Sequence, residues 1–289
     1  MNHAKQKTLV SASWLAENLD KPNIAIVDAS FFVPGGTAPA KKQFSQRHIP
    51  GSVFFDINEI ADCDSGQDHS MPTSAVFDSK IGLLGIGNES HVIAYDSMGG
   101  GCAAARVWWM FKAFGHDMVS VLNGGLVRWE MEGHPLTQTL PIRQKKSFTA
   151  KREALGQVMS KADMLANIAT QAYQVIDARS AGRFAGTDPE PRPGLRAGHI
   201  PGSINIPYTD LFDSAEKTLA SETQLKEHFD CAGVDLTRPI TTSCGSGVTA
   251  CTIALAAYLL GKTDVSIYDG SWVDWASDPD TPIATGPTS

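Results

Sequence analysis

The chain has 289 residues, of which 42% are hydrophobic and 19% are charged, a composition typical of folded globular proteins. This length suggests about two domains. The formal net charge is -7 and there is no extended basic run, which argues against a nucleic-acid partner but still allows arginine-lined pockets for small anions.

The apolar runs and the cysteines indicate the compartment. No apolar run approaches the roughly 20 residues that a membrane-spanning helix requires, and residues 1–5 lack the apolar stretch of a secretory signal. The cysteine count is odd and contains no Cys-x-x-Cys pair, a pattern that fits neither a disulfide framework nor a structural zinc site. We therefore expect a protein of the reducing cytoplasm, with no membrane partner.

The two halves of the chain share three segments in the same order. The first half reads IVDAS at 26–30, HIPGS at 48–52 and NGGLVRW at 123–129, and the second reads VIDAR at 175–179, HIPGS at 199–203 and DGSWVDW at 269–275. Their nearly constant offset indicates two copies of one domain fold. We predict an N-terminal domain over residues 1–137, a polar linker over 138–157 and a C-terminal domain over 158–289.

Short β-branched runs alternate with helical patterns in both copies. The expected strands lie at residues 24–27, 92–95, 119–122, 175–176, 239–242 and 265–268, and the expected helices at 13–19, 103–114, 160–170 and 249–260. Nearly continuous apolar strands are typical of a sheet covered on both faces. The alternation predicts an α/β fold, in which each copy is a parallel sheet flanked by helices. Ligands of such sheets bind beyond the carboxyl ends of the strands.

One loop carries the residues best suited to chemistry. Cys244 follows a predicted strand and precedes Gly-Ser-Gly and an alanine-rich helix that starts near Val248. Gly245 and Gly247 would let the backbone curl, so that several N–H groups point into one concavity. The helix N-terminus adds partial positive charge there. Because both features favour an anionic sulfur, we predict that Cys244 is a nucleophile.

The alternative for a free cysteine is a small buried hydrophobic side chain, its usual role. That description suits Cys251, inside an apolar helix, and we expect it of Cys102 and Cys231 as well. It suits Cys244 poorly, because the glycine-rich loop offers little apolar cover. His48 and His199 occupy the same turn in both copies, which favours a structural role for them.

Residues 244–250, CGSGVTA, resemble the active loop of the 3-mercaptopyruvate sulfurtransferases, close relatives of the thiosulfate sulfurtransferases, or rhodaneses. Both HIPGS segments, residues 106–111 and residues 268–272 share the resemblance, which covers nearly the whole chain. It implies two tandem rhodanese-like domains, of which only the C-terminal one is catalytic. The chain agrees, because Asp96 stands at the N-terminal counterpart of Cys244 and a carboxylate cannot take up sulfur.

The residues after the cysteine bear on the substrate. The thiosulfate enzymes resemble one another in placing Arg and Lys there, whereas this chain has the neutral Gly245 and Ser246. The resemblance implies that Arg183 and Arg192 hold the carboxylate and ketone of 3-mercaptopyruvate, a task that suits guanidinium groups; the alternative is that both are solvated. The predicted substrate-binding residues are Arg183, Arg192, Gly245, Gly247, Val248 and Thr249.

The expected reaction moves one sulfur atom. Cys244 takes it from 3-mercaptopyruvate as a persulfide, pyruvate leaves, and a thiol such as that of thioredoxin, or cyanide, removes the outer sulfur. No metal or organic cofactor is expected. The resemblance implies a proton relay of Ser246, His69 and an acidic residue, but the acidic position falls on Asn58. Either the relay is incomplete, or another carboxylate substitutes, namely Glu59, Asp56 or Asp68. An ordinary surface role for His69 is the alternative.

Three other functions compete with this interpretation. The first is a thiosulfate sulfurtransferase on the same fold. The second is a cysteine phosphatase, which requires an arginine six residues after the cysteine, where this chain has Ala250. The third is a non-enzymatic sulfur carrier or protein-binding module, against which two complete domains and paired arginines argue.

Overall fold

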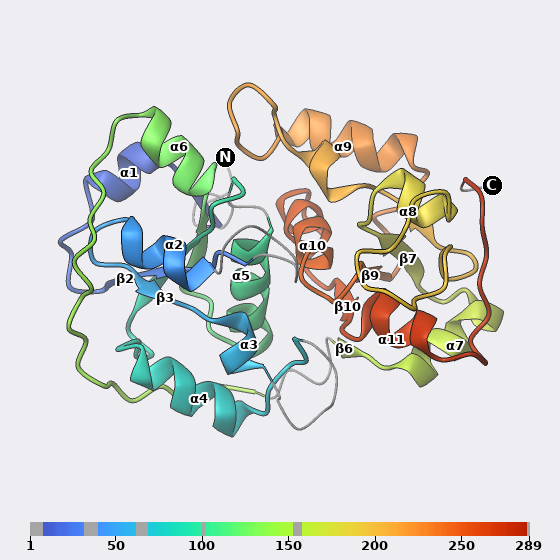
Figure 1. Ribbon diagram of the computed structural model, residues 1–289, viewed down its shortest axis with the longest axis horizontal. Coiled ribbons are helices and arrows are strands. Elements are labelled where there is room, and N and C mark those ends of the chain that lie inside the picture. Colours follow the sequence, from blue (N-terminus) through green and yellow to red (C-terminus); the bar gives the residue numbers. More distant parts are fainter. Residues whose placement is uncertain (1–7, 32–39, 62–68, 100–101, 153–157, 288–289) are drawn as a thin grey trace. The chain divides into compact units, whose positions relative to one another are not determined.

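The computed structural model describes residues 8–31, 40–61, 69–99, 102–152 and 158–287. The chain divides into two compact units (Figure 1). The first comprises Met1–Asp64, Met71–Ala154 and Asp213–Leu219, and the second comprises Ser65–Ser70, Leu155–Phe212 and Ala220–Ser289. Within the described ranges, none of the helices has both the length and the apolar character that crossing a membrane would take.

The first unit is built on a parallel sheet. Its strands are β1 (Leu9–Val10), β2 (Ile24–Asp28), β3 (Val53–Phe54), β4 (His91–Tyr95) and β5 (Val119–Leu122), in the order β1-β5-β4-β2-β3. Its helices are α1 (Ala12–Ala16), α2 (Ala40–Gln46), α3 (Ile57–Ile60), α4 (Ser74–Leu83), α5 (Ala103–Ala113) and α6 (Gly125–Met131). Every pairing in the sheet is parallel, as the near-continuous apolar strands predict.

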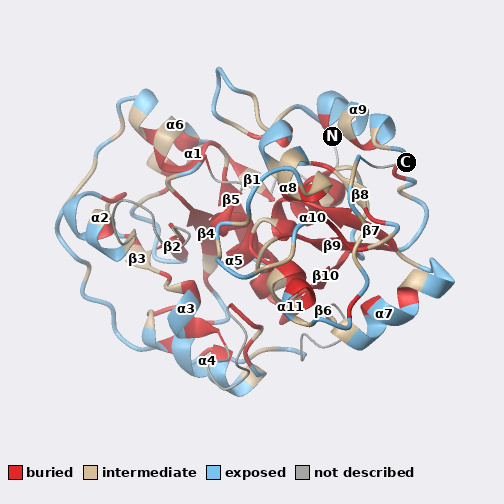
Figure 2. Cartoon of the chain, turned by 45° about the vertical axis from the view of Figure 1, so that its right-hand side comes forward, coloured by how far each residue is buried: buried red, intermediate tan, exposed pale blue. Residues whose placement is uncertain are grey.

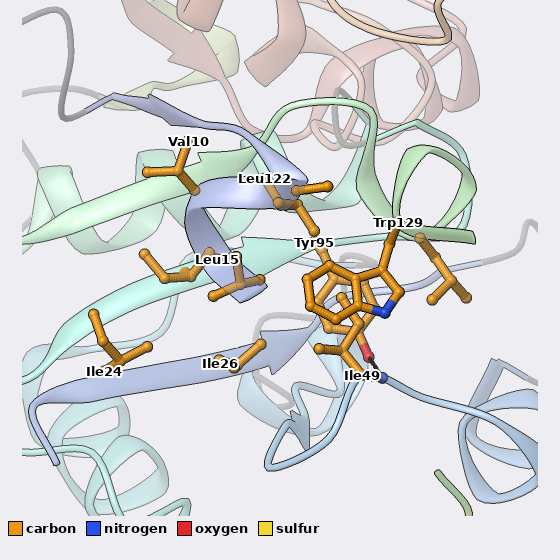
Figure 3. Close-up of a cluster of buried hydrophobic side chains, with 11 residues drawn as sticks. Val10, Leu15, Ile24, Ile26, Ile49, Tyr95, Leu122 and Trp129 are labelled. Carbon is orange, nitrogen blue, oxygen red and sulfur yellow. Dashed lines mark hydrogen bonds between the residues drawn. The ribbon is translucent and has the colours of Figure 1, made fainter. Parts of the chain in front are cut away.

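Helices cover both faces of this sheet. Successive side chains of a strand point to opposite faces, so Ile24 and Ile26 of β2 share one face, where they join a buried cluster with side chains of α1 and α6 (Figure 3). Trp129 of α6 is fully buried within that cluster. The opposite face is covered by α5, which contacts β4 and β5. Burial of each large apolar side chain here contributes roughly 1.5–3 kcal/mol.

The second unit repeats this architecture. Its strands are β6 (Val158–Met159), β7 (Gln174–Asp177), β8 (Ile204–Asn205), β9 (Ile240–Ser243) and β10 (Ser266–Tyr268), in the order β6-β10-β9-β7-β8. Its helices are α7 (Lys161–Thr170), α8 (Ala181–Ala185), the 3-10 helix η3 (Tyr208–Leu211), α9 (Glu222–Cys231), α10 (Ala250–Leu259) and α11 (Ser271–Ser277). The strand order matches that of the first unit position by position. The predicted α/β fold with two copies of one parallel sheet is confirmed.

Burial follows the same scheme in the second unit. Figure 2 shows β7, β9 and β10 in the colour of buried residues, while the outer faces of α7 and α9 are exposed. Helices α7 and α11 contribute Met164, Trp272 and Trp275 to a cluster on one face. Helix α10 lies against β7, β9 and β10 and is buried over nearly its whole length. This burial explains why its sequence is apolar on all sides.

The register shows which residues of the two units correspond. Asp28 pairs with Tyr95 in the first sheet, and Asp177 pairs with Ser243 in the second. The residues that follow, Asp96 and Cys244, are therefore equivalent in position.

A backbone hydrogen bond supports this equivalence. Leu126 N–H donates to the Asp96 carbonyl at 2.9 Å, and Trp272 N–H donates to the Cys244 carbonyl at 3.0 Å. Because Leu126 and Trp272 are the second residues of α6 and α11, the two loops are held in the same way.

The structure differs from the sequence-based expectations at the edges of the elements. Helix α1 ends at Ala16, although the pattern predicts a helix over residues 13–19, and it begins after Ser11, whose Oγ accepts the Trp14 N–H at 3.1 Å. The short strands β1, β3, β6 and β8 are absent from the expectation, because two residues are too few to display a period.

The stretch predicted as a linker is not free of the first unit. Phe148 is buried and makes edge contacts with Phe77 and Phe111. Asn88 and Thr149 exchange two hydrogen bonds, at 2.7 and 3.0 Å. Residues 138–152 thus cover part of the first unit while carrying the chain onward.

Glu132, at the end of α6, is the best-connected surface carboxylate of the first unit. It accepts hydrogen bonds from Arg128 Nε at 2.7 Å and Ser13 Oγ at 2.9 Å, and it contacts His134 Nε2 at 3.1 Å. These contacts, that with Arg128 foremost, lower the pKa of Glu132 from 4.5 to about 2. The stabilisation from this group is therefore complete above pH 4.5 and is lost as the pH falls toward 2.

We expect Glu132→Gln to lower the free energy of unfolding by about 1 kcal/mol at pH 7, a value that allows for solvent screening of a surface group. The difference from the wild type should shrink between pH 4.5 and pH 2, because the wild-type carboxylate becomes protonated in that window. Urea unfolding at pH 7, 4 and 2.5 measures it. The control is Asp230→Asn, which removes the exposed Lys226–Asp230 pair and should change stability little; a Glu132 difference that does not depend on pH would contradict the assignment.

Candidate active site

The loop between β9 and α10 is anchored to the start of α11. Cys244 N–H donates to Ser271 Oγ at 3.1 Å, and the Cys244 carbonyl accepts the Trp272 N–H at 3.0 Å. The next carbonyl, that of Gly245, accepts the Val273 N–H at 2.9 Å. Cys244 therefore lies beyond the carboxyl end of a central strand, and both polar backbone atoms of this residue are fixed.

Burial of the cysteines differs in part from the expectation. Cys244 is only 2% exposed, although its loop is poor in apolar side chains. The loop is hydrogen-bonded to α11 at Cys244 and Gly245, a tertiary contact that the local sequence does not reveal. Cys102 and Cys251 are buried as predicted, but the prediction for Cys231 is wrong, because it ends α9 on the surface.

The two loop glycines serve different purposes. Gly247 has φ +77°, and a side chain there would approach the Asp269 carbonyl oxygen at 2.7 Å, so its backbone conformation requires glycine. Gly245 does not have positive φ, although the backbone bends there as well. A side chain at Gly245 would instead lie 3.2 Å from Arg183 Nη2. Its absence leaves room for that guanidinium beside the loop.

Arg183 reaches the Cys244 loop from α8 and is held by a buried carboxylate. Glu190, whose side chain is 3% exposed, accepts from Arg183 Nη2 at 2.6 Å and from Nε at 3.2 Å. Glu190 also accepts from Arg179 Nη1 at 2.9 Å. One edge of the Arg183 guanidinium is thus occupied by Glu190, and Nη2 also lies close to Gly245.

Arg179 links this arrangement to the sheet. Its guanidinium is fully buried, pairs with Asp177 at 2.6 Å and lies 4.2 Å from the ring centre of Trp272. The counterpart in the first unit is Ser30, which carries no charge. The alternating charges of Asp177, Arg179, Glu190 and Arg183 balance one another, as buried ionic groups must.

Sequence reasoning missed Glu190 and Ser271. Glu190 stands between two prolines and is flanked in the chain by Arg183 and Arg192, and an acid between two arginines is a signal for an ion pair. Ser271 occupies the place of Gly125 when the two halves are aligned, so the repeat itself marks it as an exception. Neither signal identifies the atom that the side chain contacts.

The other predicted site residues differ in how far they are buried. Arg192 and Ser246 are half-buried, and Val248 is buried next to the half-buried Thr249 that precedes α10. His69 is 6% exposed, has φ +62° and groups with the second unit, which also holds Cys244. It is thus not the exposed surface histidine of the alternative.

The acidic candidates for a relay are engaged elsewhere or undescribed. Glu59 pairs with Lys41 at 3.0 Å, and Asp56 caps α3 by accepting the Asn58 and Glu59 N–H groups. Asn58 itself is exposed on α3. Asp68 lies outside the described residues.

The equivalent loop of the first unit, between β4 and α5, binds a carboxylate. The carboxylate of Asp96 is fully buried and accepts the N–H groups of Met98 at 2.8 Å, Cys102 at 3.2 Å and Ala104 at 2.9 Å. These donors belong to the loop and to the N-terminal turn of α5. The loop after the fourth strand of this fold is therefore an anion cradle, which Asp96 fills with its own side chain.

Comparison with known proteins assigns the family. A model of the rhodanese-like domain matches residues 11–132 and again residues 160–278. This chain belongs to the rhodanese family. The prediction of a sulfurtransferase with two rhodanese-like domains in tandem is confirmed by these matches and by the relatives.

The relatives of this rhodanese-family chain carry two names. Human 3-mercaptopyruvate sulfurtransferase is 45% identical over 279 residues, covering 93% of this chain and 92% of the human protein. Bovine thiosulfate sulfurtransferase is 43% identical over 290 residues, covering 97% and 96%. Among solved structures, SseA of Escherichia coli, described as a 3-mercaptopyruvate sulfotransferase, has a TM-score of 0.81 at 36% identity, covering 91% of this chain and 98% of SseA. Identity alone does not separate the two activities.

Proposed function

We propose that this chain transfers sulfur from 3-mercaptopyruvate to a thiol or cyanide acceptor through a persulfide on Cys244. The substrate choice rests on the position of Arg183. Its Nη2 would lie only 3.2 Å from a side chain at Gly245, so the guanidinium is next to the Cys244 loop. The loop itself supplies no side-chain charge for a sulfonate-like dianion, whereas a guanidinium beside it suits a carboxylate. Arg192, from the same loop as Glu190, would provide the second guanidinium.

The reaction balances with these groups. The Cys244 thiolate attacks the sulfur of 3-mercaptopyruvate, an S–S bond forms, and the C–S bond breaks with its electron pair moving into the enolate of pyruvate. A proton then converts the enolate into pyruvate. In the second half-reaction the acceptor thiolate, or cyanide, attacks the outer sulfur and restores the Cys244 thiolate.

The loop N–H groups are proposed to stabilise the sulfur anions. Support comes from the first unit, where N–H groups of the equivalent loop bind the Asp96 carboxylate. With Cys244 in that position, backbone donors of Gly245 through Thr249 and the N-terminus of α10 would face a thiolate or persulfide instead. No metal or organic cofactor enters the scheme.

Proton transfer is assigned to two residues of the second unit. Ser246 and His69 both group with the second unit, in agreement with a role near Cys244. The engagement of Asp56 and Glu59 in other contacts leaves the relay without its acidic member from α3. We propose that Ser246 and His69 handle the proton without it.

Acceptor and compartment follow from the chemistry. A persulfide is discharged by a thiolate, so a reduced protein such as thioredoxin in a reducing compartment, for which we propose the cytoplasm, would complete the cycle. One plant relative is named as mitochondrial, and the matrix would serve equally well for this chemistry. The negative net charge argues against nucleic acid as a partner.

The test compares two sulfur donors. The ratio of kcat/KM for 3-mercaptopyruvate to that for thiosulfate, with cyanide as acceptor, should favour 3-mercaptopyruvate by more than about 10-fold, because thiosulfate lacks the carboxylate that Arg183 is proposed to bind. Intact-mass measurement after donor treatment should show one added sulfur atom. A preference for thiosulfate would favour the second candidate, which the relatives named thiosulfate sulfurtransferase support.

A further inference from the structure

Ser271 combines an unfavourable backbone with complete burial. It is the first residue of α11, has φ +51° and is fully buried. The equivalent residue of the first unit is Gly125, with φ +52°. The fold therefore imposes the same left-handed conformation at both places, and only glycine adopts it without cost. Ser271 retains a side chain where the first unit has none.

The hydroxyl of Ser271 is fully used. Ser271 Oγ donates to the Tyr268 carbonyl at 2.8 Å, at the end of β10, and accepts the Cys244 N–H at 3.1 Å, just after β9. Because its single proton goes to Tyr268, the oxygen can serve the Cys244 N–H only as an acceptor. The side chain thus joins the ends of two neighbouring strands at the residue that carries the thiol.

We propose that Ser271 is a positioning residue for Cys244, an inference that rests on the proposed function. Its hydroxyl fixes the Cys244 N–H while the Trp272 N–H fixes the Cys244 carbonyl, so the peptide units on both sides of the cysteine cannot turn. With the backbone fixed, rotation about the Cα–Cβ bond alone sets the direction of the Cys244 sulfur relative to the N–H groups of the loop. The first unit, which carries Asp96 and transfers no sulfur in this scheme, has no such requirement and keeps glycine.

The test is Ser271→Gly, which removes the hydroxyl and the backbone strain together. Its melting temperature should stay close to that of the wild type, because relief of the strain at φ +51° offsets the loss of two buried hydrogen bonds. The rate of persulfide formation should nevertheless fall by about 10-fold to 100-fold, since small displacements of a reacting group cost rates of this size. The fall should appear in kcat, with KM changing less than about twofold.

A measurement made without the sulfur donor separates a positioning role of Ser271 from a general structural role. Carboxymethylation of Cys244 by iodoacetate, followed by peptide mapping, should be slower in Ser271→Gly at neutral pH. Ser271→Ala, which keeps the strain and lacks the hydroxyl, should show the same slowing together with a lower melting temperature. Gly125→Ser is the matched control, and should lower the melting temperature while leaving the thiol reactivity of Cys244 unchanged.

The outcomes are distinguishable from failure of the proposed function. If Ser271→Gly forms the persulfide and is alkylated at the wild-type rates, the inference is overturned, even when Cys244→Ser is inactive as the proposed function requires. A rate loss in Ser271→Gly that merely accompanies a large fall in melting temperature, with the same rate loss in Gly125→Ser, would overturn it as well. If Cys244→Ser retains sulfur transfer, the proposed function fails first.

Discussion

Replacing Cys244 by serine should abolish sulfur transfer, with pyruvate release falling by at least about 10⁴-fold. Serine keeps the size of the side chain and its place beneath the loop, but an alcohol cannot accept sulfur from the donor to form a persulfide. The substitution should leave folding intact, because the backbone contacts of Cys244 with Ser271 and Trp272 do not involve the thiol. Steady-state pyruvate release and intact mass after donor treatment measure the effect.

Cys231→Ser is the control for this experiment. Cys231 is exposed at the end of α9 and takes no part in the proposed reaction, so its replacement should preserve both activity and the added sulfur mass. Pyruvate release by Cys244→Ser at a wild-type rate would refute the mechanism. Persulfide mass on a different cysteine would move the site elsewhere.

The sequence predicts the architecture better than the atoms of the site. The internal repeat and the alternation of strands and helices suffice for the two parallel sheets, because hydrophobic period and repeat are local properties. Cys244 is identified for the same reason, since strand, glycine-rich loop and helix follow one another in the chain. Edge strands such as β1 are too short to show a pattern.

Contacts between distant residues are what the sequence hides. Gly245 is predicted to bend the backbone, but the sequence does not show that its missing side chain also leaves room for Arg183, which lies 62 positions earlier. The anchoring of the Cys244 backbone likewise depends on α11, which begins 27 residues later. Ser271 acts through a hydrogen bond to Cys244, 27 positions earlier, and Glu190 through ion pairs within its own segment, and in neither case does the sequence identify the partner.

Arg183→Lys should reduce kcat/KM for 3-mercaptopyruvate by about 100-fold, equivalent to roughly 2–3 kcal/mol of transition-state stabilisation. Lysine keeps the positive charge but has no planar fork, so it cannot reproduce the paired contacts of the guanidinium with Glu190 while also offering bidentate hydrogen bonds to a substrate carboxylate. Glu190 retains its contact with Arg179 at 2.9 Å, which limits the loss of stability. A melting temperature close to that of the wild type should therefore accompany the loss of activity.

The loss should be selective for the donor that carries a carboxylate. With thiosulfate as donor, Arg183→Lys should lose less activity, because that dianion presents no carboxylate to the fork and a lysine can still attract it. Arg238→Lys is the matched control, since Arg238 is exposed and its guanidinium donates to the Gln171 carbonyl at 2.8 Å, away from the Cys244 loop. Kinetics with both donors measure the selectivity. An equal loss for both donors would assign Arg183 to holding the loop rather than to recognising the substrate, because only a substrate contact distinguishes one donor from the other.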